Sequence, residues 1–269
     1  MNRQAVNPYL PSWEYIPDGE PHVFNGRVYV YGSHDRFNAP IFCVNDYVCW
    51  SAPVEDLSEW RYEGVIYRKK QDPKNPLGYH LLFAPDVCQG PDGRYYLYYA
   101  FDFLGIMSVA VCDTPAGEYK FLGHIHYADG TLWGRRRGDQ LPFDPGVLAD
   151  DDGRVWLYSG FYDAVPAILT GGHKLRCDGG TVLELEKDMV TIKTEPRVIF
   201  PKKGPGAFQG HEFFEASSIR KEGKTYIFVY SSRHNHELCY ATSQSPDRDS
   251  SYGGTLVSQG DIFLVSDLS

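Results

Sequence analysis

A short hairpin pattern occurs four times along this 269-residue chain and limits the folds open to it. Each copy has a turn pair that ends in glycine, then a basic residue and an aromatic-rich run. The copies read NGRVYVYGSHD from 25, DGRYYLYYAFD from 92, DGRVWLYSGFYD from 152 and EGKTYIFVYSS from 222. Asn-Gly and Asp-Gly are strong signals for a β-hairpin with a type I′ turn, whose two central residues both have positive φ. The pattern therefore predicts four hairpins that turn at Gly26, Gly93, Gly153 and Gly223.

The spacing of these hairpins predicts the architecture. Successive turn glycines are about 60 to 70 residues apart, which leaves room for roughly four short strands with their loops. Helical periodicity is weak throughout, and no segment shows a helix with both caps. Repeated units of this size are typical of a β-propeller, in which each unit is a four-stranded blade. We predict an all-β protein, a β-propeller forming a single domain over residues 1–269, with an ordinary β-sandwich as the alternative.

An acidic residue precedes each predicted hairpin. About eight residues before the turn glycines stand Asp18, Asp86, Asp144 and Glu215. A sandwich gives no reason for a carboxylate to recur with each hairpin. In a propeller the strand that enters the turn is the innermost one, and its beginning lies near the central axis at one mouth. The repeat therefore predicts that the four acids line one central pocket.

Charge and hydropathy argue against several other classes of protein. The formal net charge is −9 and the pI is about 5.4, so the average field repels nucleic acid and anionic membranes. The one basic cluster, Arg135 to Arg137, is interpreted as a solvated loop. No apolar run approaches the roughly 18 residues needed to span a bilayer, and the N-terminus lacks the apolar core of a signal peptide. We expect a cytoplasmic protein with no nucleic-acid or membrane partner.

The cysteines give no indication of a metal site or a redox site. They occur singly and without C-x-x-C spacing, at positions 43, 49, 88, 112, 177 and 239. We expect free thiols that behave as small hydrophobic side chains, because a reducing compartment does not favour disulfides.

Several carboxylates in one pocket suit two kinds of chemistry. They can bind a hard cation such as Ca²⁺, which prefers oxygen ligands. They can also divide acid and base roles, as glycoside hydrolysis requires. No Ser-His-Asp elbow, H-E-x-x-H or P-loop pattern competes. The aromatic content of 15% suits stacking on sugar faces, although β structure explains it equally well.

The motifs around these acids closely resemble glycoside hydrolase family 43, five-bladed propeller enzymes that act on xylose- and arabinose-containing polysaccharides. The resemblance covers nearly the whole chain, through NPYLPSWEYIPDGEPHVFNGRVYVYGSHD, FAPDV, FDPGVLADDDGRVWLYSG, GHEFFEASSIRKEGKTYIFVYSS and CYATS. It implies an inverting glycosidase of the α-L-arabinofuranosidase or β-xylosidase type. Its partners would be hemicellulose-derived oligosaccharides, from which it releases L-arabinofuranose or D-xylose, and no cofactor would be required.

The resemblance assigns catalytic roles to three carboxylates. Asp18 matches the general base that activates water, and Glu215 matches the general acid. Asp144 matches the third carboxylate, which orients the acid and raises its pKa. Glu212 is the one rival for the acid role. In an inverting enzyme the base and the acid lie roughly 6.5–9.5 Å apart, which leaves room for the water.

Three further residues are candidates for substrate binding. Asp86 matches the last position of a Trp-Ala-Pro-Asp motif, in which Phe83 replaces the tryptophan here. Phe83 would stack on a sugar, or belong to the core. For Asp86 a structural hydrogen-bonding role is the alternative. His34, at the end of its predicted strand, is placed at the rim of the pocket.

The resemblance does not extend to a complete fifth blade. After YGGTLVSQGDIF the sequence ends at LVSDLS, and the Asn-His-Gly-Ser-like segment whose histidine helps to hold calcium or water in relatives is not found. We therefore expect a propeller that is open at its last blade, with little support for a structural calcium ion. Unpaired sheet edges invite pairing with another chain, so a homodimer through this edge is a hypothesis.

Two functions from other classes stay open. One is a carbohydrate-binding propeller without turnover, left by truncation. The other is a structural or calcium-binding propeller that uses the same four acids as ligands. Within the enzyme reading, the sequence does not choose between arabinose and xylose, or between cleavage at chain ends and internal cleavage.

Overall fold

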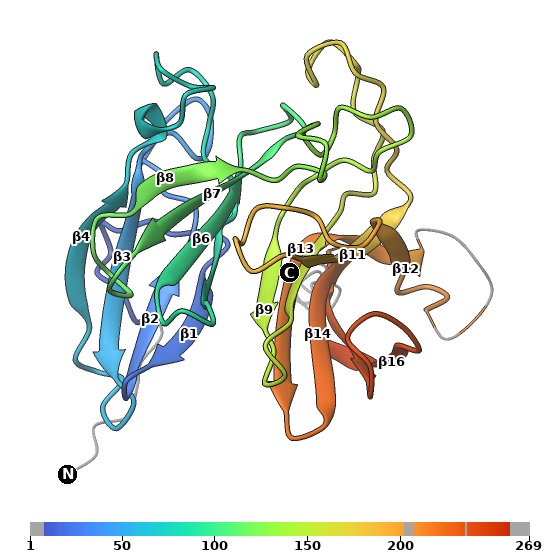
Figure 1. The fold of residues 1–269 in the computed structure, drawn as a ribbon. Coiled ribbons are helices and arrows are strands. Elements are labelled where there is room, and N and C mark those ends of the chain that lie inside the picture. Colours follow the sequence, from blue (N-terminus) through green and yellow to red (C-terminus); the bar gives the residue numbers. More distant parts are fainter. Residues whose placement is uncertain (1–7, 202–205, 207, 235, 259–269) are drawn as a thin grey trace, which may run out of the picture. The chain divides into compact units, whose positions relative to one another are not determined.

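The computed structural model describes residues 8–201, 206, 208–234 and 236–258, and within them it contains sixteen β-strands and one short 3-10 helix. The strands form four separate antiparallel sheets of four strands each (Figure 1). Every strand pairs with the next strand of its sheet along the chain. The all-β prediction is confirmed, and the sheets are blades of a β-propeller. In the described part of the chain, no helix has the length and apolar character needed to cross a membrane.

The chain divides into two compact units. The first comprises Met1–Asp102 and Met107–His124, and the second comprises Phe103–Ile106 and Ile125–Ser269. Each unit contains two of the four sheets. The assignment of residues 1–269 to a single domain stays a prediction.

The first unit begins with a four-stranded meander. Its strands are β1 (Glu20–Phe24), β2 (Arg27–Tyr31), β3 (Tyr47–Pro53) and β4 (Arg61–Tyr67). The helix η1 (Lys69–Gln71) follows. The strands of the second sheet are β5 (Asp86–Gln89), β6 (Tyr95–Ala100), β7 (Met107–Cys112) and β8 (Lys120–His124).

Tyrosine side chains and one buried carboxylate form the centre of the first unit. Tyr67 and Tyr99 are fully buried, and their hydroxyl oxygens lie 2.6 Å apart. The Tyr99 hydroxyl donates to Asp72 Oδ2 at 2.7 Å, and His124 Nε2 lies 3.0 Å from Asp72 Oδ1. Burial by itself would raise the pKa of Asp72, but the hydrogen bonds from His124, the Lys74 amide and Tyr99 hold that pKa below its ordinary value.

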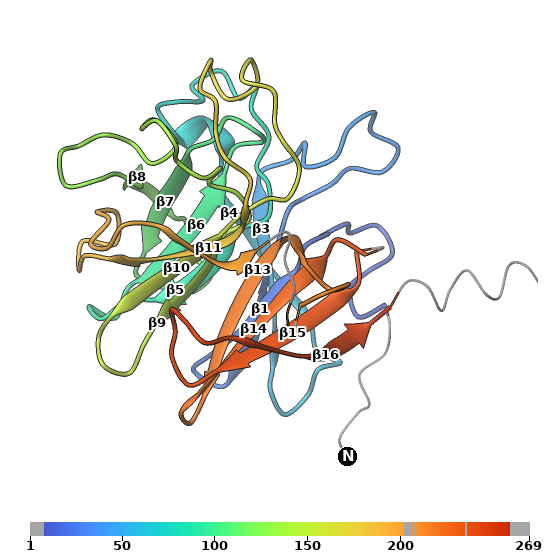
Figure 2. The same cartoon turned by 90° about the vertical axis from the view of Figure 1, so that its right-hand side faces the viewer.

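The second unit has the same organisation. Its third sheet consists of β9 (Gly146–Ala149), β10 (Val155–Ser159), β11 (Gly179–Leu185) and β12 (Arg197–Pro201). The fourth consists of β13 (Phe213–Glu222), β14 (Thr225–Ser232), β15 (Leu238–Ser243) and β16 (Ser251–Val257), which lie side by side in orange and red in Figure 2. Stacked aromatic rings from both sheets form the core, with Phe200 and Phe228 at a centroid distance of 4.1 Å.

The four predicted hairpins are present, but their turns differ. Gly26, Gly93, Gly153 and Gly223 all have positive φ. A two-residue turn with both residues at positive φ, as predicted, occurs at Asn25–Gly26. At Gly93 and Gly153 the prediction of a type I′ turn is wrong, because the loops hold three residues. Their closing bonds run from Gly90 to Arg94 and from Asp150 to Arg154.

The basic cluster is more than a solvated loop. The Arg135 guanidinium donates to the carbonyl oxygens of Leu104, Gly105 and Gly134 at 2.8–3.0 Å, so it holds a loop of the second unit together. Arg136 lies over the ring of Tyr127. The interpretation as a solvated loop is therefore wrong for Arg135. All six cysteines are free thiols, as predicted.

Candidate active site

Asp18 lies in the loop just before β1, in the left-handed region with φ of 56°. The close passage of this loop past the end of β2 depends on Gly32, because a Cβ there would lie 2.7 Å from the Pro17 carbonyl oxygen. The Ser33 hydroxyl donates to Asp18 Oδ2 at 2.9 Å. The local backbone and one hydrogen bond therefore fix the carboxylate at the beginning of its sheet, as the sequence predicts.

The surroundings of Asp18 make its carboxyl less acidic. The residue keeps an exposed surface, yet the atoms packed around its carboxyl displace water, and this raises the pKa above the ordinary value. The hydrogen bond from Ser33 opposes the shift, and the negative charge of Asp35 adds to it. A carboxyl tuned in this way ionises closer to neutral pH and is a better proton acceptor than a fully solvated aspartate.

Asp86 is the first residue of β5 and is completely buried. Its Oδ1 accepts from the Val87 amide at 2.7 Å and lies 2.6 Å from His22 Nε2. The histidine belongs to β1, so this contact ties the two sheets of the first unit together. These contacts match the structural alternative for Asp86, and its contact with substrate stays a prediction.

Phe83 and His34 are also engaged within the first unit. Phe83 is buried, its ring lies 5.4 Å from that of Phe42, and its carbonyl accepts from the Tyr47 hydroxyl. His34 Nδ1 lies 2.9 Å from the Asp46 carbonyl oxygen, and Nε2 lies 2.9 Å from Glu14 Oε1. Binding of substrate by either residue stays a prediction.

Asp144 and Glu215 come together in the second unit. Asp144, just before β9, is buried and has φ of 45°. Its Oδ2 accepts from the amide of Ala216 at 3.2 Å, and Ala216 directly follows Glu215. Strands β9 and β13 approach closely here, because a Cβ on Gly146 would lie 2.7 Å from the Ser217 carbonyl oxygen. The third carboxylate is thus held against the backbone that carries the proposed acid.

Glu215 lies in β13 at an irregular part of the strand. The register with β14 shifts on both sides of it, and Ala216 has positive φ. The side chain is 26% exposed, and Oε1 lies 3.9 Å from His236 Nδ1. Such irregularities change the direction of a side chain and are frequent next to active sites. A half-buried carboxyl of this kind can donate a proton and still reach a ligand.

A phenylalanine directly precedes each of these two acids in the chain. Phe143 and Phe214 directly precede Asp144 and Glu215, and both contact Phe161, with centroid distances of 4.8 and 5.4 Å. Flat rings beside carboxylates suit a sugar, whose C–H faces stack on them. These phenylalanines were not among the predicted site residues, although the motifs FDP and FFE place one before each acid.

Two groups of metal-ligating side chains also went unpredicted. Glu20, His22 and Asp86 form one in the first unit, and His211, Glu237 and Cys239 form another in the second. Neither follows a short spacing motif, because in each group residues far apart in the sequence are brought together only by the fold.

Comparison with known proteins agrees with these observations. A family model described as glycosyl hydrolases family 43 matches residues 17–261. A xylosidase/arabinosidase of Thermoclostridium stercorarium is 59% identical over 99% of the chain, and the match spans 55% of that protein. A xylosidase/arabinosidase of Bacteroides ovatus is 30% identical over 93% of the chain and 80% of that protein. The chain thus spans about half the length of the first of these relatives.

Solved structures show the same fold. The GH43_1 enzyme from Xanthomonas citri in complex with xylose is 26% identical, with a TM-score of 0.70 over 90% of this chain and 74% of that one. A β-xylosidase/α-arabinofuranosidase from a compost microbial metagenome, in a calcium-free complex with xylotriose, is 27% identical, with a TM-score of 0.70 over 94% and 80%. Because the family model covers most of its length, this chain belongs to glycosyl hydrolases family 43.

Proposed function

We propose that this chain is an inverting glycoside hydrolase that releases D-xylose or L-arabinofuranose from hemicellulose-derived oligosaccharides. The observation that carries the proposal is the contact between the Asp144 carboxylate and the backbone amide next to Glu215, among phenylalanine rings. Membership of the family and the names of the relatives, which are xylosidases/arabinosidases, support the pentose as the sugar released.

In the proposed reaction the three carboxylates have different roles. Glu215 donates its proton to the glycosidic oxygen as the bond from this oxygen to the anomeric carbon breaks. Asp18 takes a proton from water, and the resulting hydroxide forms the new bond on the opposite face of the sugar. The negative charge of Asp144 disfavours ionisation of Glu215 and so keeps the acid protonated. These steps use side chains and water alone and need no cofactor.

The test is hydrolysis of xylobiose, 4-nitrophenyl β-D-xyloside and 4-nitrophenyl α-L-arabinofuranoside by the 269-residue chain and three variants. Asp18→Asn is expected to lower kcat by about 10²- to 10⁴-fold, because the water loses its base. Glu215→Gln is expected to lose hydrolysis of natural oligosaccharides, whose poor leaving groups need the proton. Glu212→Gln is the matched control and is expected to keep most of its activity. Full activity of Glu215→Gln on xylobiose, whose sugar leaving group needs the proton, would reject the assignment of the acid.

A carbohydrate-binding propeller without turnover is the other candidate. The same experiment separates it, because such a protein would bind xylo-oligosaccharides in calorimetry while neither the wild type nor a variant released product. Binding unchanged by Glu215→Gln, with no hydrolysis by the wild type, would favour this reading over an enzyme.

A further inference from the structure

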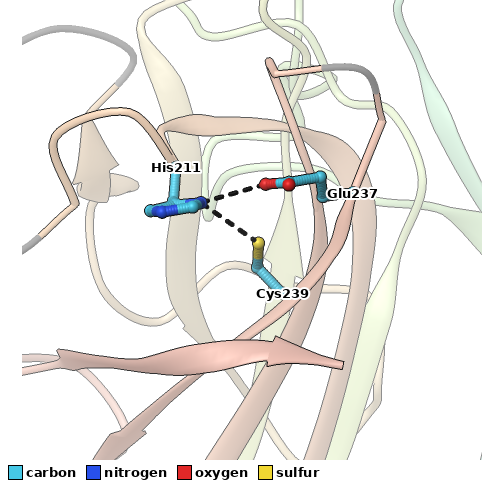
Figure 3. Close-up of side chains that lie close together, drawn as sticks. All are labelled: His211, Glu237 and Cys239. Atoms are coloured by element: carbon cyan, nitrogen blue, oxygen red, sulfur yellow. Dashed lines mark hydrogen bonds and ion pairs between the residues drawn. The ribbon is translucent and has the colours of Figure 1, made fainter. Parts of the chain in front are cut away.

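Three donor side chains of different chemistry, none of them a proposed catalytic carboxylate, meet in the second unit (Figure 3). His211 Nδ1 lies 3.0 Å from Glu237 Oε2 and 3.9 Å from Cys239 Sγ. All three ligand atoms are within 4.8 Å of one another. His211 precedes β13, Glu237 precedes β15 and Cys239 belongs to β15, so the group joins the beginnings of two strands in one sheet.

Neighbouring side chains hold two of the three donors, His211 and Glu237, in place. The His211 ring stacks on Tyr252 at 4.5 Å with an interplanar angle of 9°, and the His211 carbonyl accepts from the Tyr230 hydroxyl at 2.6 Å. The Ser258 hydroxyl donates to the other Glu237 oxygen at 3.0 Å. Side chains fixed in this way lose little freedom when they bind a ligand, which is the usual arrangement around a metal site.

We propose that His211, Glu237 and Cys239 form a binding site for a single Zn²⁺ ion. Imidazole, carboxylate and thiolate are all zinc ligands, and the thiolate disfavours Ca²⁺ and Mg²⁺. In a tetrahedral zinc site such ligand atoms lie about 3.3–3.6 Å apart. The distances from His211 Nδ1 to Glu237 Oε2 and to Cys239 Sγ, 3.0 and 3.9 Å, lie within a few tenths of an ångström of this range, and the ligand atoms of Glu237 and Cys239 are within 4.8 Å of each other. A water molecule would complete the tetrahedron.

Proton transfers accompany binding. The Cys239 thiol loses its proton to solvent. The His211 imidazole, whose Nδ1–H donates to Glu237 in the metal-free site, loses this proton to solvent and takes one up on Nε2, so that Nδ1 and Sγ each offer a lone pair to the metal. The hydroxyl of Thr255, 3.5 Å from Sγ, is placed to donate to the thiolate. The Glu237 carboxylate replaces its bond to His211 with a bond to zinc. The bound ion would fasten the loop before β13 to β15.

The experiment uses the untagged 269-residue chain, treated with a chelator and dialysed. Titration with Zn²⁺ in a calorimeter is expected to show one binding site and a raised Tm, because the ion binds the folded state. Titration with Co²⁺ is expected to give a near-ultraviolet thiolate-to-metal charge-transfer band. Binding without that band would overturn the assignment of Cys239, and no binding of either metal would overturn the site.

Single substitutions test which side chains bind the metal ion. Cys239→Ser is expected to lose the Co²⁺ band and to weaken Zn²⁺ binding at least about tenfold, since even indirect partners of a metal contribute that much. Cys112→Ser, which removes a thiol in the other unit, is the matched control and is expected to keep both. Glu237→Gln preserves side-chain volume and is expected to weaken binding with an unchanged circular dichroism spectrum. Equal Zn²⁺ affinity in all of these proteins would reject the proposal.

Discussion

Two aspartates of the first unit show how their surroundings set the acidity of single side chains. Asp18 and Asp72 both lie where burial raises a carboxyl pKa. Asp18 receives one side-chain hydrogen bond, from Ser33, and its pKa stays raised. Asp72 receives bonds from His124, Tyr99 and an amide, and its pKa is lowered. The hydrogen-bond donors and the nearby charges, Asp35 beside Asp18 and His124 beside Asp72, together set the direction of each shift.

Two neighbours shift the pKa of the proposed base, Asp18, in opposite directions. Ser33→Ala removes a hydrogen bond that lowers the pKa of Asp18, so the acidic limb of the kcat/KM profile is expected to move to higher pH. Asp35→Asn removes a negative charge that raises this pKa, and the limb is expected to move to lower pH. Activity is lost on the acidic side because a base must be ionised. Shifts in the same direction for both variants would contradict the role of Asp18.

Asp72 is expected to make folding sensitive to acid. Its folded pKa is below its unfolded value, so its contribution to stability is present above an unfolded pKa of about 3.9 and is lost as pH falls through the folded pKa. Asp72→Asn is expected to lower the free energy of unfolding at neutral pH by about 1–3 kcal/mol and to flatten its decline in acid. Urea unfolding at several pH values measures both. An unchanged acid dependence would show that other groups are responsible.

At the level of strands, the sequence could predict those features whose cause lies within a few neighbouring residues. Positive φ at Gly26, Gly93, Gly153 and Gly223 was predictable because a tight hairpin requires it within two residues. The length of the loops at Gly93 and Gly153 was not predictable, because it depends on how the flanking strands pair. The acids Asp18, Asp86, Asp144 and Glu215 begin their sheets as predicted, with Glu215 three residues into β13.

The site residues that the sequence did not reveal depend on contacts between distant segments. Phe161 contacts Phe214 only because the second unit packs them together. Cys239 and His211 also lie close together in the fold, although they are 28 residues apart in the sequence. No spacing rule connects such residues, since two strands and their loops intervene. The contacts of Asp86 and Phe83 likewise depend on their burial in the folded protein, and this burial could not be predicted from the motif that contains them.

The fourth hairpin offers a test of turn chemistry. Gly223 has φ of 59°, and a Cβ there would meet nothing within 4 Å, so any cost of substitution comes from the backbone. Gly223→Ala is expected to lower the free energy of unfolding by about 1 kcal/mol, because alanine disfavours the left-handed region. Gly223→Asn is the control and is expected to cost less, since asparagine tolerates this conformation. Equal midpoints of urea unfolding for both variants would contradict the explanation.

The proposed reaction draws on both units of the whole molecule. The first unit supplies Asp18, and the second supplies Asp144 and Glu215. Each unit has one feature that suits a proposed role: a raised pKa at the proposed base Asp18, and Asp144 bonded to the amide next to the proposed acid. The stereochemistry of hydrolysis reports on both roles together, because a water activated by a base attacks the face opposite the leaving group.

The measurement to make is proton NMR of the single sugar released from 4-nitrophenyl β-D-xyloside, recorded before the product mutarotates. Inversion at the anomeric carbon predicts that α-xylose appears first and that the β anomer follows on the timescale of mutarotation. If β-xylose appears first, Asp18 does not act as a base on water. The carboxylates would then have to work through a covalent intermediate, and the proposed mechanism would be wrong.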